Sequence, residues 1–159
     1  MRVKPIPPPP GDLEAVRAAQ RAVPLVPGSE ADCCTLIADQ LDLQGRDIAR
    51  TWLTFLRGLR LVAEGRRGFV RTRVEVDRER LAEGLLAGVF PARELLHALD
   101  SEPLTADEAF DAVEAEIPRW ERTKDHDWRG TWRTRVGYLL DWLVLAGLAE
   151  RREDGYVRT

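Results

Sequence analysis

The chain is predicted to be mainly α-helical with two small β-hairpins, and to consist of two copies of one small domain. The last twelve residues repeat the stretch 61–72 without a gap, so that Leu61 aligns with Leu148 and Phe69 with Tyr156, an offset of 87 positions. Elsewhere, apolar residues recur with the spacing of amphipathic helices. In both copies such a helical segment leads into a short ribbon with Gly or Asp in its turn. A repeat of this length that occurs only twice indicates a duplicated domain rather than a solenoid.

Length and composition agree with two small domains. The chain has 159 residues, of which 44% are hydrophobic and 32% are charged, and this length accommodates one domain or two small ones. We expect a proline-rich N-terminal arm at 1–11, a first domain at 12–73, a linking strand and helix at 74–88, and a second domain at 89–159. The arm is either an ordered strap or a disordered tail. No apolar run approaches the roughly 20 residues that span a bilayer, and the arm lacks the apolar core of a signal peptide, so we expect a cytoplasmic protein.

Caps and chain breakers delimit three helices in the first domain. Asp12 and Ser29 can cap the first two helices, and the short turn 42–45 leads into a third helix over about 46–58. The pattern of 61–73, with glycines in its turn, predicts a β-hairpin. Helical spacing places a set of apolar side chains in the core of this domain: Ala49, Trp52, Leu53 and Leu56 from the third helix, with Leu36 from the second.

The second domain follows the same order of elements. Pro91 suits the first turn of a helix, and Thr105 with Glu108 three residues later forms a capping box for the next one. A polar loop is expected over 119–128, before a long third helix over about 128–146 and the closing hairpin. The corresponding core residues are Leu95, Leu139 and Leu143.

This order of elements resembles the winged helix-turn-helix fold. The segment 41–53 is similar to its tight turn and recognition helix, and 59–70 is similar to the transition from that helix into the wing. The resemblance covers nearly the whole chain beyond the arm, once per copy, and implies two winged-helix domains in tandem. The loop expected over 119–128 departs from the tight turn of the fold. Because one fold hosts many roles, the resemblance says more about structure than about function.

Positive charge is concentrated in one part of the first domain. The formal net charge of −3 argues against a generally basic, nonspecific nucleic-acid binder. Between Gly45 and Arg73, however, eight arginines stand against Asp47 and Glu64, a local charge of +6 in an otherwise acidic chain. This stretch is the predicted recognition helix and wing, the elements that contact DNA in winged-helix proteins that bind it. The alternative is an ordinary solvated face in a chain whose basic residues are nearly all arginine.

The predicted DNA contacts lie on the outer face of that helix and at the tip of the hairpin. With Ala49 and Leu53 turned to the core, helical spacing turns arginines and threonines outward, where they could contact phosphates or guanine edges. Two arginines in the turn could reach the DNA backbone or a neighbouring minor groove. The candidate DNA-binding residues are Arg46, Arg50, Thr51, Thr54, Arg57, Arg66 and Arg67.

The second copy lacks this pattern. Asp141 stands at the position of Thr54, and its hairpin turn, 152–155, contains Glu and Asp. Its basic residues lie instead in the expected loop and at the start of the long helix, where they alternate with three tryptophans: Trp120, Trp128 and Trp132. Such a segment could stack on bases, could bind a protein partner, or could simply fill a small core.

Patterns typical of catalysis and metal binding are absent from the sequence. His97 is expected at the edge of the core, and His126 lies in the polar stretch 124–127, which only superficially resembles a metal site. Because Cys33 and Cys34 are adjacent, they do not have zinc spacing and are predicted to be two reduced core thiols. There is no dinucleotide fingerprint, phosphate-binding loop or nucleophile elbow. We therefore expect no enzyme, no metal and no cofactor.

Two functions fit these observations. In the first, the protein is a transcriptional regulator whose first copy reads double-stranded DNA, while the second supplies homodimer or protein contacts; most DNA readers of this type act as dimers. In the second, it is a non-enzymatic tandem winged-helix interaction module within a larger chromosome-segregation or transcription assembly. The two differ in the surface of 45–73. The DNA hypothesis would lose its main support if those arginines paired with the acidic residues of the linker, which are Glu75, Asp77, Glu79 and Glu83.

Overall fold

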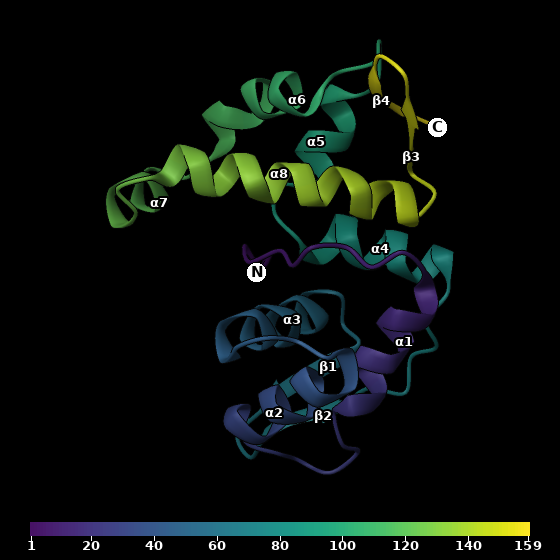
Figure 1. The fold of residues 1–159 in the computed structure, drawn as a ribbon, viewed down its shortest axis with the longest axis vertical. Coiled ribbons are helices and arrows are strands. Elements are labelled where there is room, and N and C mark those ends of the chain that lie inside the picture. Colours follow the sequence, from purple (N-terminus) through teal and green to yellow (C-terminus); the bar gives the residue numbers. More distant parts are fainter. The chain divides into compact units, whose positions relative to one another are not determined.

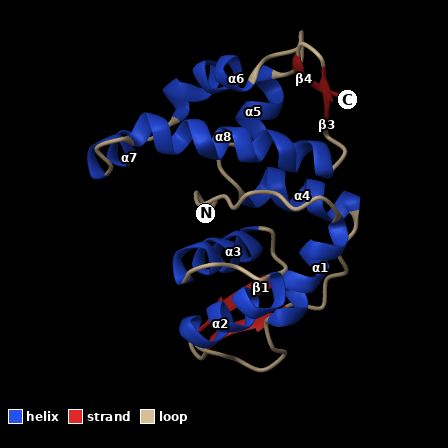
Figure 2. Ribbon diagram, in the orientation of Figure 1, coloured by secondary structure: helices blue, strands red, loops and turns tan.

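The structure, a computed structural model, describes all residues from 1 to 159 and contains eight α-helices and two β-hairpins (Figure 1, Figure 2). The chain divides into two compact units, Met1–Val89 and Phe90–Thr159. Unit 1 contains α1 (Leu13–Ala22), α2 (Glu30–Leu41), α3 (Arg46–Gly58), β1 (Val62–Gly65), β2 (Gly68–Arg71) and α4 (Arg78–Gly88). Unit 2 contains α5 (Ala92–Ala98), α6 (Ala106–Val113), a 3-10 turn (Glu114–Glu116), α7 (Arg119–Lys124), α8 (Trp128–Leu145), β3 (Ala149–Arg152) and β4 (Gly155–Arg158).

The two hairpins are built alike, at the offset that the repeat predicts. Val62 pairs with Arg71 in the first hairpin, and Ala149 pairs with Arg158 in the second. A third segment joins each hairpin through one aromatic residue. Phe69 bridges to Gly28, and Tyr156 bridges to Leu104, each through two backbone hydrogen bonds of 2.8 and 2.9 Å. Phe69 and Tyr156 therefore occupy equivalent positions, as predicted.

The predicted caps form as the sequence indicates. Asp12 Oδ1 accepts a hydrogen bond from the Ala15 N–H (3.1 Å), and Ser29 Oγ accepts one from the Asp32 N–H (3.0 Å). The capping box of α6 is complete, because the Thr105 and Glu108 side chains each accept a hydrogen bond from the other residue's backbone N–H. These bonds satisfy N–H groups that a helix leaves free in its first turn.

The cores confirm the expected helix faces with one exception. Ala49, Trp52, Leu53 and Leu56 are buried in unit 1, as are Leu95, Leu139 and Leu143 in unit 2. Leu36, in contrast, is 40% exposed, so its predicted place beside Trp52 is wrong. Helix α2 buries Cys33, Cys34 and Ile37 instead. At about 100° per residue, Cys33, Cys34 and Ile37 share one arc of the helix, and Leu36 lies outside that arc, toward solvent.

The arm and the segment after the first hairpin are both parts of unit 1. The Val3 N–H donates to the Gly88 carbonyl (2.8 Å), and the side chains of Val3 and Ile6 are buried, so the arm is an ordered strap. The strand expected in the linking segment does not form. The backbone carbonyls of the segment after β2 accept hydrogen bonds from side chains of α1, as described below. This segment runs in an extended conformation as far as α4.

The second correction concerns unit 2. The stretch 119–128, expected to be a polar loop, contains the six-residue helix α7, and only Asp125 to Asp127 separates it from α8. Helix α8 runs along α5 and α6 (Figure 1). Unit 2 thus carries a short helix where unit 1 has the turn between α2 and α3.

Candidate nucleic-acid interface

Helix α3 buries one side and exposes a stripe of polar side chains on the other. Arg46, Arg50 and Arg57 are exposed, and Thr51 and Thr54 are half-buried. The Thr51 hydroxyl donates to the Asp47 carbonyl at 3.1 Å, one turn earlier in the helix. The predicted outward face of α3 is therefore the face that the structure exposes.

Two of the helix arginines form ion pairs within unit 1. Arg50 Nε lies 2.9 Å from Glu30 Oε1 on α2, and Arg57 Nη1 lies 2.5 Å from Glu64 Oε1 on β1. All four side chains are about half exposed. Ion pairs that water reaches contribute little free energy, typically about 0–1 kcal/mol. Such pairs orient the guanidinium groups but leave them accessible to an anion that binds them more tightly than the carboxylate does.

The turn between β1 and β2 presents two further cations. Arg66 and Arg67 are exposed and form no ion pair, and neither does Arg46 at the start of α3. Gly68 ends the turn with a φ of 123°, a backbone conformation that glycine adopts at little cost. None of the arginines from 45 to 73 pairs with an acidic residue of the linking segment, whose Glu83 pairs instead with Arg80.

The same positions in unit 2 are occupied differently. The counterpart of Arg46 is Arg133, which lies 3.3 Å from Asp107 and over the ring of Phe110. Gly137, Tyr138 and Val144 replace Arg50, Thr51 and Arg57, and Glu153 and Asp154 replace the two arginines of the turn. Helix α8 therefore lacks the cationic stripe of α3.

One difference between the copies is a part-buried hydrogen bond between the second hairpin and α8. The Tyr156 hydroxyl donates to Asp141 Oδ1 at 2.6 Å, which fastens β4 to α8. Burial of the phenol, together with this bond, raises the pKa of Tyr156 to about 12. In unit 1 the equivalent residues are Phe69 and Thr54, which cannot form this bond because phenylalanine has no hydroxyl. The paired change at both positions is visible in the aligned sequence and could have predicted the contact.

The three tryptophans of unit 2 lie in three different environments. Trp132 is buried and belongs to the core. Trp128 is half-buried, with the guanidinium groups of Arg122 and Arg129 at 4.7 and 5.2 Å from the ring centroid. Trp120 is 52% exposed on α7. Of the three roles considered for these residues, filling the core is therefore the one that Trp132 has.

The remaining candidate groups are the two cysteines, the polar stretch 124–127 and His97. Cys33 and Cys34 are buried and unbonded to each other, and burial raises the pKa of both thiols. In the stretch 124–127, Asp125 accepts hydrogen bonds from the Asp127 N–H and the Thr131 hydroxyl, which lower the pKa of its carboxyl. His97 is exposed on α5 rather than at the edge of the core. No three His, Cys, Asp or Glu side chains are grouped so that they could hold a metal ion.

The fold and the exposed helix of unit 1 define a tandem winged-helix protein. A family model described as the halobacterial double winged helix domain matches residues 1–159, and the chain belongs to this family. Comparisons with curated proteins and with solved structures found no match. A double winged-helix domain suggests a DNA-binding or regulatory function. No helix combines the length and the apolar character needed to cross a membrane.

Proposed function

We propose that the protein is a transcriptional regulator that binds double-stranded DNA through α3 and the wing of unit 1, the wing being the hairpin 62–71. The observation that carries this proposal is the difference between the two copies. The two copies share one hairpin register, and each has a helix before the hairpin. Only unit 1, however, carries arginines along the whole outer face of that helix, at 46, 50 and 57, and two more at the wing tip, whereas the arginines of α8 stand in its first half. In a chain with a formal charge of −3, a stretch with eight arginines against two acidic residues between 45 and 73 favours a specific duplex contact.

The residues fall into two groups by the contact that they are placed to make. Arg66 and Arg67 at the wing tip would bind phosphates and set the orientation of the protein on DNA without reading its sequence. On α3, Arg46 and Arg50 would enter the major groove, where an arginine fork recognises guanine. Formation of these contacts would require Arg50 to leave Glu30, a small cost for an exposed pair. Unit 2 would then supply homodimer or partner contacts.

Binding of fluorescent duplex fragments of the source genome, measured by anisotropy at several salt concentrations, tests the proposal. Replacement of Arg66 by Glu together with Arg67 by Asp gives unit 1 the wing tip of unit 2. This variant should bind all duplexes more weakly, and its salt dependence should flatten by roughly one unit per lost phosphate contact. Arg50→Ala should instead relax sequence preference.

The matched control uses the equivalent helix position in each copy. Arg46→Ala should weaken binding, whereas Arg133→Ala, which removes the same charge from unit 2, should not. Equal effects of the two substitutions would refute an interface confined to unit 1. If the folded protein shows no salt-sensitive binding to any duplex at low ionic strength, the alternative function, a winged-helix interaction module within a larger assembly, replaces this one.

A further inference from the structure

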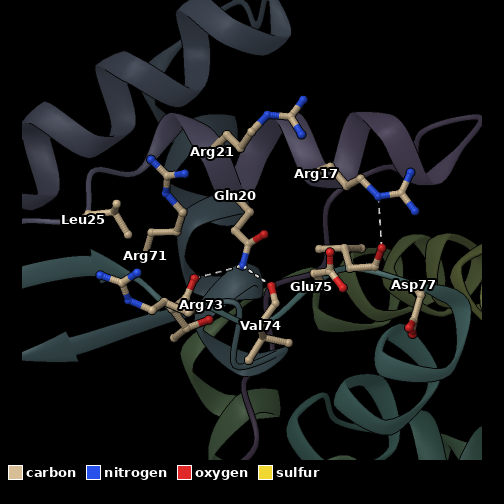
Figure 3. A pocket seen from close by; sticks show the side chains of 11 residues that line it. Arg17, Gln20, Arg21, Leu25, Arg71, Arg73, Val74, Glu75 and Asp77 are labelled. Carbon is tan, nitrogen blue, oxygen red and sulfur yellow. Dashed lines mark hydrogen bonds between the residues drawn. The ribbon is translucent and has the colours of Figure 1, made fainter.

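An open pocket lies in unit 1 between α1 and the extended segment that follows β2. Its volume is about 640 Å³, which is within the range of pockets that hold small molecules. Residues of α1, together with 71–77, form its walls, and Leu25 closes one end (Figure 3). Arg71, the last residue of β2, is the only one of these residues that belongs to the wing, and none of them is among the candidate DNA contacts.

Side-chain hydrogen bonds fix the two walls relative to each other. Gln20 is 6% exposed, and the two hydrogens of its Nε2 face three carbonyls, those of Val74 (2.9 Å), Leu61 (3.3 Å) and Thr72 (3.4 Å), so that one hydrogen is shared between two acceptors. One helical turn earlier, Arg17 Nε donates to the Val76 carbonyl at 3.0 Å. These bonds hold 72–76 in an extended form without a neighbouring strand. The pocket is therefore preformed, which lowers the entropic cost of binding a ligand.

The two ends of the pocket differ in charge. Arg71, Arg73 and Leu25 lie at one end (Figure 3). Glu75 and Asp77 lie toward the other, beside Arg17, whose charge is offset by its ion pair with Glu14. At the acidic end, Asp77 Oδ1 is already an acceptor for the Arg80 N–H at 2.8 Å and caps α4.

At the basic end the cations are not neutralised. Arg71 Nε donates to the Val23 carbonyl at 2.9 Å, and its two terminal nitrogens form no hydrogen bond or ion pair. Arg73 forms no hydrogen bond and no ion pair, and it is exposed. Beside these two guanidinium groups, Leu25 is 50% exposed. An arginine pair next to an accessible apolar side chain matches a ligand with an anionic head and an apolar body.

We propose that this pocket is a binding site for a small organic anion, a carboxylate or phosphate ester, whose head group binds Arg71 and Arg73 and whose apolar part contacts Leu25. The site lies at the base of the wing and contains none of the seven candidate DNA contacts, so its occupancy does not depend on the function proposed above. It would give a regulator of this fold a place for a small-molecule effector at the base of the wing, where β2 ends.

Isothermal titration calorimetry of the full chain with phenyl phosphate, which carries both the anionic head and an apolar body, tests the site. We expect saturable binding of one molecule per chain. Inorganic phosphate should bind more weakly because it lacks the apolar body, and benzyl alcohol should not bind because it lacks the charge. Equal affinity for phenyl phosphate and either control compound would overturn the proposed recognition.

Arg73→Ala is the decisive variant, because Arg73 makes no contact that the fold requires. Loss of a charge-assisted hydrogen bond should weaken phenyl phosphate binding about tenfold or more, whereas Arg73→Lys should keep part of the affinity. Arg93→Ala removes an exposed charge that forms no ion pair and lies outside both the pocket and the proposed DNA interface, so it should leave the affinity unchanged. The proposal fails if Arg73→Ala and Arg93→Ala act alike or if no saturable binding is seen, and neither result would bear on DNA binding by α3.

Discussion

The hydrogen bond between Tyr156 and Asp141 makes the stability of unit 2 depend on alkaline pH. Burial and this bond raise the pKa of Tyr156 from 10.0 to about 12, so the phenol keeps its proton in the folded state at pH values where it loses the proton in the unfolded state. The stabilisation is therefore fully present below pH 10 and is lost as the pH rises toward 12. A shift of about two pKa units corresponds to about 3 kcal/mol in total, of which about 1.4 kcal/mol is lost by pH 11.

Tyr156→Phe removes the titrating group and gives unit 2 the residue that unit 1 has at this position. At neutral pH the variant should be less stable by about 1.5 kcal/mol, the lower end for a hydrogen bond to a charged group, because the half-buried Asp141 can be hydrated in its place. As the pH rises to about 11, the protein with Tyr156 should lose that advantage, and the two free energies of unfolding should become nearly equal.

Urea unfolding of both proteins at several pH values from 8 to 11.5 measures this difference. All other titrating groups are shared, so they cancel in the comparison. Tyr138→Phe, on the same helix as Asp141 and half-buried, is the control: it removes a hydroxyl that forms no hydrogen bond and should cost less stability at pH 8 than Tyr156→Phe does. A stability difference between the unsubstituted protein and the Tyr156→Phe variant that stays constant from pH 8 to 11.5 would refute the reasoning.

Three further predictions concern packing in unit 1 and in α8. Trp52→Ala should reduce the free energy of unfolding by about 3–5 kcal/mol, because the indole is only 4% exposed; a loss below about 1 kcal/mol in chemical denaturation would show that the site collapses around the cavity. Gly88→Ala should destabilise the protein by about 1–3 kcal/mol, because an added Cβ would overlap the Gly58 carbonyl, a backbone group. Gly137→Ala, with open space around its Cβ, should instead stabilise α8 by about 0.5–1 kcal/mol. Thermal unfolding of the two glycine variants side by side checks both signs, and a shift in the same direction would contradict the packing argument.

The features that the sequence predicted correctly depend on local physics or on the repeat. Caps such as Asp12 and Thr105 act on the next turn of the same helix, so a few residues determine them. The 87-residue offset predicted that β1–β2 and β3–β4 would share one register. The exposed stripe of α3 followed from the spacing of its apolar residues alone. For these elements the tertiary structure added little beyond the residues at which each helix and strand begins and ends.

Part of the candidate DNA interface could likewise be predicted from local sequence patterns. The exposure of Arg46, Arg50 and Arg57 was predictable from helical spacing, and that of Arg66 and Arg67 from their place in a turn. Their ion pairing was not predictable, because Glu30 and Glu64 lie on other elements. The interface itself stays a prediction until duplex binding is measured.

Sequence by itself thus determined the two winged-helix copies and the positions of their helices and hairpins, whereas only the tertiary structure decided what fills the spaces between elements. Gln20 meets the carbonyls of Thr72 and Val74 across more than 50 residues of chain, and this contact creates the pocket and replaces the strand expected there. Helix α7 forms where a run of polar residues predicted a loop, and Glu121 on it is buried with Lys124 3.4 Å away. Such contacts depend on which distant segments the fold brings together, so they cannot be predicted from the pattern of neighbouring residues in the sequence.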